Sequence, residues 1–79
     1  MVLYYLDICD GDQLASEDDV GTDLPDLEAV RLAVTVSAFE LMYHGMRRGT
    51  VADARSFRVR DLDGRIVLTM SFADIVRLN

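Results

Sequence analysis

The single histidine and the single cysteine are the residues best suited to nucleophilic catalysis. A thiol is activated when an imidazole lies beside it and a third group orients that imidazole. Cys9 precedes the Asp10-Gly11 turn signal, whereas His44 falls late in a long predicted helix. Nothing in the spacing brings the two together, so we predict no catalytic pair. We expect His44 to be a polar residue at the helix edge and Cys9 to be an unreactive thiol near a turn.

Acidic residues are numerous enough to suggest a divalent cation site. The stretch Asp61-Leu62-Asp63-Gly64 imitates the opening of a calcium loop, but the later ligands and the glutamate at the twelfth position are missing. It also fits a hairpin turn, as does Asp10-Gly11-Asp12. The acidic cluster at residues 17–19 could hold a cation only weakly. We therefore expect no metal site and no cofactor.

Three arginines gather on one face of a predicted C-terminal hairpin: Arg58, Arg60 and Arg65. They could hold an anion or a nucleic-acid phosphate. The alternative is that they pair across strands with Asp7 or Glu17 and pack on Tyr5. We favour the alternative, and keep anion binding as a second hypothesis.

The charge of the chain argues against generic nucleic-acid or membrane-surface binding. The 79 residues include 14 acids and eight basic residues, all arginine, so the net charge is −6 and the pI is about 4.4. Residues 1–28 hold nine of the acids and no arginine, while the remainder holds five acids and all eight arginines. Two such halves attract each other on folding, or the acidic half faces a basic partner; we favour the first.

No export signal or membrane span is recognisable in the sequence. The apolar run from Val2 to Leu6 is too short for a signal core, and no stretch approaches the roughly 20 apolar residues of a membrane span. We expect a cytoplasmic protein.

The first residues predict a strand and a hairpin. Residues 2–8 are β-branched, aromatic and aliphatic, and Asp10-Gly11 marks a turn. A two-residue loop at Asp10-Gly11 would place Leu14 opposite Asp7. We favour a three-residue Cys9–Gly11 loop, which pairs Leu6 with Leu14. One face then carries Tyr4, Leu6, Ile8 and Leu14.

The remaining chain predicts an acidic loop, a long helix, a second hairpin and a short helix. The loop covers residues 17–24, the first helix residues 26–48, and the last helix residues 72–78, capped by Ser71. Strands at residues 56–61 and 65–70 flank a two-residue Asp63-Gly64 turn. This register pairs Arg60 with Val67, Val59 with Leu68 and Phe57 with Met70, and gives an apolar face of Phe57, Val59, Ile66, Leu68 and Met70.

These elements predict one α+β domain spanning residues 1–79. Two β-hairpins are joined by one long helix, in the order ββαββ plus a short C-terminal helix. The four-stranded sheet is mostly antiparallel, and the helix packs on one of its faces.

The long helix has two apolar stripes on opposite sides, although one small sheet can cover only one of them. The first stripe contains Leu27, Val30, Val34, Ala38 and Leu41. The second contains Leu32, Val36, Phe39, Tyr43 and Met46. Either the C-terminal residues Phe72, Ile75, Val76 and Leu78 cover the second stripe, or a second copy of the chain does. We favour the homodimer.

Four segments also carry a resemblance to a known family: residues 4–8, 10–12, 21–29 and 59–65. With their aromatic pair and Asp-Ile strand, Asp-Gly turn, Leu-Pro-Asp-Leu-Glu-Ala run and late Asp-x-Asp-Gly hairpin, they resemble small alphaproteobacterial proteins of rhizobia and methylobacteria, grouped as a domain of unknown function. The resemblance implies a short, standalone cytoplasmic bacterial protein. It carries over no catalytic residue.

These observations together favour a protein that acts by association. We expect a non-enzymatic, homodimeric interaction or regulatory module of unknown protein partner. Nucleic acid is not the expected partner, although the arginine face keeps anion or nucleic-acid binding as the alternative.

Overall fold

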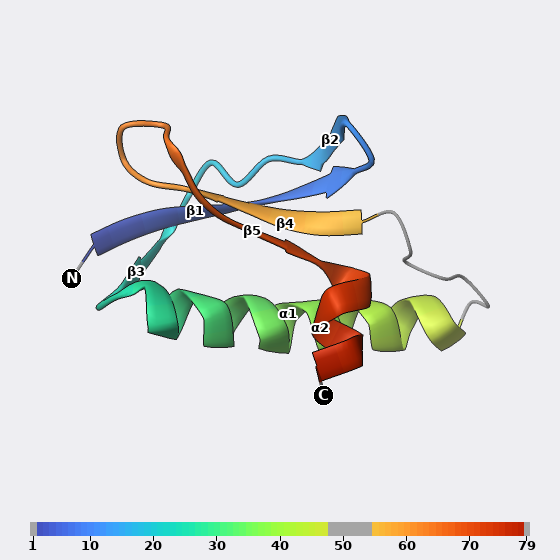
Figure 1. Ribbon diagram of the computed structural model, residues 1–79. Coiled ribbons are helices and arrows are strands. Elements are labelled where there is room, and N and C mark those ends of the chain that lie inside the picture. Colours follow the sequence, from blue (N-terminus) through green and yellow to red (C-terminus); the bar gives the residue numbers. More distant parts are fainter. Residues whose placement is uncertain (1, 48–54, 79) are drawn as a thin grey trace.

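A computed structural model describes residues 2–47 and 55–78, apart from the side chains at positions 42, 44–47 and 76–78. A twisted antiparallel sheet lies over one long helix, and a short helix flanks that helix (Figure 1). The elements follow in the order β1 (Val2–Asp10), β2 (Gln13–Ser16), β3 (Thr22–Leu24), α1 (Leu27–Arg47), β4 (Arg55–Arg60), β5 (Ile66–Ser71) and α2 (Phe72–Leu78). The predicted α+β class is confirmed, and the predicted connector after the long helix lies outside the described residues.

The sheet has five strands rather than the four that the sequence predicts. Its main order is β2-β1-β4-β5, and β3 also pairs with β1. Thr22–Leu24 pairs antiparallel with Val2–Tyr4, in a stretch predicted to be loop. The prediction failed here because three residues between Gly21 and Pro25, one of them Asp23, carry almost no strand signal of their own. Only the pairing with β1 makes this stretch a strand.

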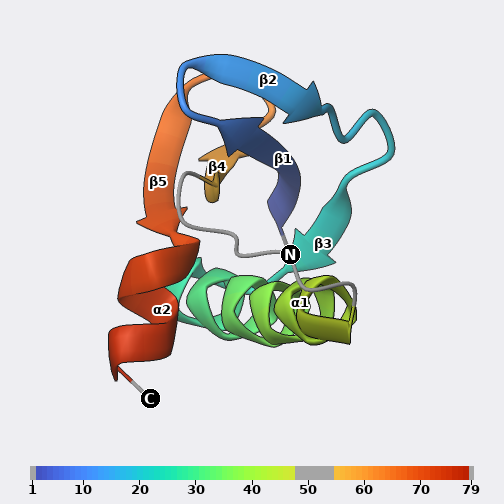
Figure 2. The same cartoon turned by 90° about the vertical axis from the view of Figure 1, so that its right-hand side faces the viewer.

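The hydrophobic core lies between the sheet and the two helices. One stripe of α1 contributes Val30, Val34 and Ala38, all fully buried. Phe57 of β4 stacks on Phe72 of α2, with ring centroids 5.2 Å apart. The core cluster of buried residues contains Tyr4, Val30, Val34, Ala38, Phe57, Val59, Phe72 and Ile75. Figure 2 shows how Phe72 and Ile75 join this core: their helix, α2, follows directly after β5 and lies beside α1.

The register of the first hairpin differs from the prediction. Cys9 pairs with Leu14 and Asp10 with Gln13, so the loop is Gly11-Asp12 and contains two residues. Gly11 has a φ of 63° at the first loop position, which favours glycine. Leu14 is therefore exposed and does not join the core, whereas Tyr4, Leu6 and Ile8 do pack there as predicted. Cys9 lies in the strand and is buried, not in the turn.

The second hairpin is closed by a three-residue loop in place of the predicted two-residue turn. The Asp61 amide donates to the Arg65 carbonyl, and the Gly64 amide donates to the Asp61 carbonyl. Gly64 has a φ of 85°, the left-handed conformation that ends such loops.

A register shift between Val59 and Arg60 then restores the predicted pairing deeper in the hairpin. Arg60 pairs with Ile66, not with Val67, whereas Val59 pairs with Leu68 and Phe57 with Met70 as predicted. The register shift also exchanges the predicted environments of two neighbouring side chains. Val67 packs against the core, and Ile66, predicted to be on the apolar face, is exposed.

Both helices begin where the sequence predicts. The Asp26 carboxylate accepts a hydrogen bond from the Ala29 amide at 2.9 Å and caps α1, and the Ser71 hydroxyl accepts one from the Asp74 amide at 3.0 Å and caps α2. Within the described parts of the chain, neither helix combines the length and the apolar character needed to cross a bilayer.

Candidate functional site

The outward side of α1 carries a row of large apolar side chains that the described parts of the fold leave exposed. Four residues of the predicted second stripe are exposed: Leu32 at 67%, Val36 at 51%, Phe39 at 40% and Tyr43 at 61%. Met46 continues the stripe in sequence, but its side chain is not among those described. Figures 1 and 2 show that the sheet covers one side of α1 and that α2 lies beside α1.

The C-terminal segment does not cover this stripe with the side chains that the structure describes. Phe72 and Ile75 are buried in the core on the first stripe, next to Val30, Val34 and Ala38. The first stripe is itself incomplete, since Leu27 and Leu41 at its two ends remain exposed. Intramolecular cover by Phe72 and Ile75, the alternative weighed from the sequence, is therefore wrong. Val76 and Leu78 lie outside the described side chains.

The spacing of the exposed stripe is that of a helix–helix seam. Leu32, Val36, Phe39, Tyr43 and Met46 follow one another at intervals of four, three, four and three residues. This alternation keeps apolar side chains in line along one side of a helix, and it is the repeat found where two helices pack along their length. Glu40, between Phe39 and Tyr43 in the sequence, is charged and lies at the edge of the stripe.

An ion pair with a buried carboxylate, on the outer face of the sheet, organises the opposite side of the molecule. Asp7 of β1 is only 3% exposed. Its carboxylate accepts hydrogen bonds from two nitrogens of Arg60, Nε at 2.5 Å and Nη2 at 3.0 Å. Arg60 also lies over the ring of Tyr5, with its guanidinium carbon 5.0 Å from the ring centroid, and its Nη2 is 4.0 Å from a Glu17 oxygen.

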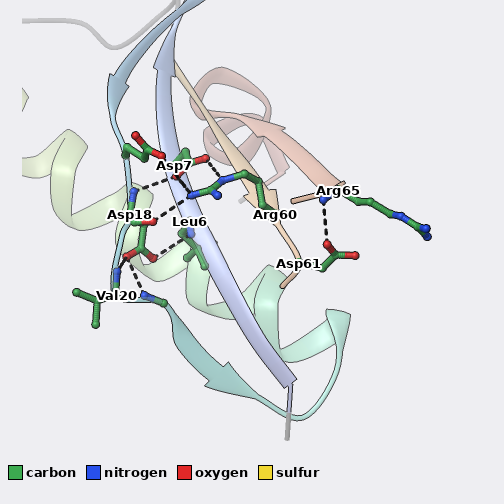
Figure 3. A network of polar contacts seen from close by, with 9 residues as sticks. Leu6, Asp7, Asp18, Val20, Arg60, Asp61 and Arg65 are labelled. Atoms are coloured by element: carbon green, nitrogen blue, oxygen red, sulfur yellow. Dashed lines mark hydrogen bonds and ion pairs between the residues drawn. The ribbon is translucent and has the colours of Figure 1, made fainter. Parts of the chain in front are cut away.

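Asp18 connects this pair to the segment between β2 and β3 (Figure 3). Its carboxylate accepts three backbone hydrogen bonds, from Leu6 at 3.0 Å, Val20 at 3.1 Å and Gly21 at 3.0 Å. Its own amide donates to Asp7 at 2.9 Å, and its carbonyl accepts from Arg60 Nη2 at 3.0 Å. The Leu6 amide is thus bonded to a carboxylate at the place where β1 lacks a strand partner between β2 and β3.

These contacts set the ionisation of both carboxyls. Burial raises the pKa of Asp7, but hydrogen bonds from Arg60 and from the Asp18 amide, with the positive charge of Arg60, bring it below its usual value of 3.8. Burial also raises the pKa of Asp18, and its three backbone hydrogen bonds and the charge of Arg60 lower it by more. The pKa of Arg60 is raised, chiefly by its hydrogen bond to Asp7. All three groups are therefore charged at neutral pH.

The three arginines of the predicted anion face do not form one cluster. Arg60 is engaged by Asp7, Tyr5 and Glu17, as the alternative interpretation predicted. Arg58 of β4 is the strand-register partner of Asp7 on β1 and is partly exposed. The Arg65 side chain extends away from Arg60, and the bonds that join Arg65 to Asp61 come from its backbone (Figure 3). The charge of Arg60 is therefore already neutralised within the fold.

The acidic turns are likewise occupied by their own backbone. One Asp61 oxygen accepts from the amides of Asp63 and Arg65, both at 2.9 Å. Among residues 2–47 and 55–78 with described side chains, no group of three His, Cys, Asp or Glu residues is arranged to hold a metal ion. Cys9 lies in β1 and the His44 side chain is not described, so the structure gives no geometry for that pair.

The Asp7–Arg60–Asp18 network was only partly foreseeable. The pairing of Arg60 with Asp7, Glu17 and Tyr5 follows from alternation along two neighbouring strands. The role of Asp18 does not follow, because its partners are backbone amides brought together by tertiary structure. The only signal was an aspartate three residues before Gly21, since short acidic side chains often accept amides within a turn.

Comparison with known proteins identifies a family but no characterised relative. The model of a domain of unknown function, DUF6894, matches residues 3–73. No curated protein and no solved structure matches. The matched range includes β1 from its second residue, α1, both hairpins and the start of α2, and so all residues of the polar network; the core residue Ile75 lies just beyond it.

Proposed function

We propose that this chain, which belongs to the DUF6894 family of domains of unknown function, is a non-enzymatic association module that works as a homodimer. The stripe of Leu32, Val36, Phe39 and Tyr43 is its interface. The observation that supports this most directly is that four large apolar side chains in helix-seam spacing lie on the one side of α1 that the fold leaves uncovered.

The size of the surface fits a modest dimer. Taking the exposed fractions of the four side chains, each copy presents on the order of 400 Å² of apolar surface. This is about the size of the largest apolar patches on monomeric proteins, which are often functional. Two such surfaces bury about 800 Å² or more together, which is below the roughly 1,200–2,000 Å² of stable interfaces and in the range of weak, transient ones. We therefore expect a dimer that dissociates in the micromolar range and whose population changes with protein concentration.

A second copy is the partner that this surface suits best. A helix-seam repeat requires another helix with a matching apolar stripe, and every copy of the chain carries one. The stripe itself is uncharged, so the net charge of −6 is kept outside the contact. Dimerisation could then serve a regulatory role, because a partner that recognises the homodimer is bound only above the protein concentration at which the homodimer forms.

The mass of the protein in solution tests this proposal. Sedimentation of the wild type over a micromolar concentration series should pass from the monomer mass of 8.9 kDa to twice that value. Phe39→Asp places a charge in the middle of the seam and should remain monomeric at every concentration, with unchanged far-ultraviolet circular dichroism.

The matched control is Leu62→Asp. Leu62 is 69% exposed in the β4–β5 loop, so an aspartate is introduced at an exposed apolar residue away from α1. This variant should dimerise as the wild type does. A wild type that stays at 8.9 kDa, or a Phe39→Asp variant that dimerises normally, would refute the proposal.

A further inference from the structure

The orientation of the two copies can be inferred from the charges at the ends of α1; this inference rests on the proposed dimer. The helix begins just after Asp26, with Glu28 in its first turn, and it ends at Arg47. The helix dipole adds partial positive charge at the first end and partial negative charge at the second. In a parallel pair each end would lie beside an identical end.

An antiparallel pair places unlike ends together. The acidic first turn of one helix then lies at the level of Arg47 of the other, and the two helix dipoles oppose each other. Antiparallel alignment therefore favours association through both the side-chain charges and the backbone, whereas parallel alignment opposes it through both.

The register can be inferred from the stripe and from Glu40. The helices are taken to cross at the level of Ser37 and Ala38 along the axis, which is the middle of α1. Val36 then lies opposite Phe39 of the second copy, and Leu32 lies opposite Tyr43 of the second copy. All four exposed apolar side chains are then used. Glu40 lies near Ala33 of the second copy, which is compatible with a carboxylate at the edge of the seam.

Moving the register by seven residues in either direction is worse. Toward the C-terminus, the shift brings Glu40 beside Glu40 of the second copy, and like charges at such positions oppose pairing. Toward the N-terminus, it leaves Tyr43 without an opposing stripe residue. We propose that two copies pack antiparallel along α1, crossing near Ser37 and Ala38, with Leu32 of one copy opposite Tyr43 of the other.

Disulfide trapping separates this arrangement from the alternatives. Leu32→Cys and Tyr43→Cys are prepared as two proteins of different mass, mixed, and oxidised with oxidised glutathione. Antiparallel packing predicts a mixed disulfide between them and little disulfide within either protein alone, because residues 32 of the two copies are about 16 Å apart along the axis. Parallel packing predicts the reverse. The wild type, whose Cys9 is buried, should form neither.

A second measurement leaves the stripe intact. A spin label at Glu28→Cys, an exposed position outside the stripe, should lie roughly 30 Å from its copy in the antiparallel pair and within about 15 Å in a parallel one. A short distance, or a dimer without the mixed disulfide, would overturn the proposed orientation or register while leaving the dimer itself intact. A wild type that is monomeric by mass, or a Phe39→Asp variant that dimerises normally, would overturn both proposals together.

Discussion

Arg60 bonds to a diagonal neighbour and not to the residue that faces it. Its strand partner on β1 is Tyr5, and the residue that faces Asp7 is Arg58, yet the two hydrogen bonds to the Asp7 carboxylate come from Arg60. The diagonal bond allows the guanidinium to cover the Tyr5 ring and to reach the Asp18 carbonyl as well. One side chain thus joins β4, β1 and the segment that leads to β3.

Replacing Asp7 tests how much this pair stabilises the fold. Asp7→Asn removes the charge and turns an amide nitrogen toward either Arg60 or the Asp18 amide. The Arg60 side chain is 25% exposed, so the cost should fall below the roughly 3–5 kcal/mol of fully buried ion pairs. We expect a loss of about 1–3 kcal/mol in the free energy of unfolding, measured by urea denaturation, because the buried side chain at position 7 keeps only part of its hydrogen bonding.

The control for this variant is Asp10→Asn, the same change on an exposed residue at the end of the same strand. It should alter the free energy of unfolding by less than about 0.5 kcal/mol. Equal effects of the two substitutions would show that the Asp7–Arg60 pair contributes little to stability.

Asp18 is predicted to act as a substitute strand partner for Leu6. In Asp18→Asn one side-chain oxygen can still accept from Val20 and Gly21, but the amide nitrogen then meets the Leu6 N–H group. Leaving a donor unpaired costs about 1–3 kcal/mol. Hydrogen exchange followed by nuclear magnetic resonance should show faster exchange of the Leu6 amide.

The neighbouring Asp19→Asn is the matched control, because Asp19 is exposed. The Leu6 amide should exchange at the wild-type rate in that variant. Unchanged exchange in Asp18→Asn would exclude the hydrogen bond from Leu6 as a source of protection.

Stability is predicted to fall in acid. The pKa values of Asp7 and Asp18 are lowered in the folded protein, so between the folded and unfolded values the unfolded chain binds more protons. The stabilisation is complete above the unfolded value of about 3.9 and is lost as the pH falls through the folded values. Urea denaturation between about pH 7 and pH 3 should show the decline mainly below about pH 4.5.

The same series with Asp7→Asn identifies the source of the decline. That variant starts from a lower stability and should lose less of it on acidification, because one of the two carboxyls is gone. A decline as steep as that of the wild type would assign the acid sensitivity to other carboxyls.

Gly21 is predicted to tolerate alanine less well than Gly64. Both have a positive φ, 83° and 85°, so alanine at either position costs about 1–2 kcal/mol through the backbone alone. A Cβ atom at Gly21 would also lie 2.8 Å from Leu3 Cδ1 and 3.1 Å from Tyr5 Cε1, whereas Gly64 has open space around it. We expect Gly21→Ala to lower the thermal midpoint clearly more than Gly64→Ala.

The Gly64→Ala variant serves as the internal reference, since it isolates the backbone cost. Similar thermal midpoints for the two variants would mean that Leu3 and Tyr5 move aside at little expense.

The helices and the inner half of the second hairpin were predictable because local signals agree with the tertiary structure there. Ser71 caps α2 as expected, and Asp26, predicted to be the first residue of the long helix, caps α1. The pairs of Val59 with Leu68 and Phe57 with Met70 follow from alternation of apolar residues. The loop of this hairpin was not predictable, because its shift by one residue is cancelled by the irregularity beside Val59.

The first hairpin and β3 depended on information that the sequence does not carry locally. Choosing the register by placing Leu14 in the core gave the wrong loop, since burial of Leu14 was not required once α2 supplied Phe72 and Ile75. The two stripes of α1 were predictable from helical periodicity alone. Only the structure shows that the described part of α2 packs on the first stripe.

The division of one sheet border into two short strands has a consequence for solubility. β2 and β3 contain four and three residues and are separated by the acidic residues Glu17, Asp18 and Asp19. A long unpaired strand at a border invites edge-to-edge stacking of molecules into fibrils, and short strands with interspersed negative charge discourage it. The border of the sheet that β2 and β3 form is therefore poorly suited to templating amyloid growth.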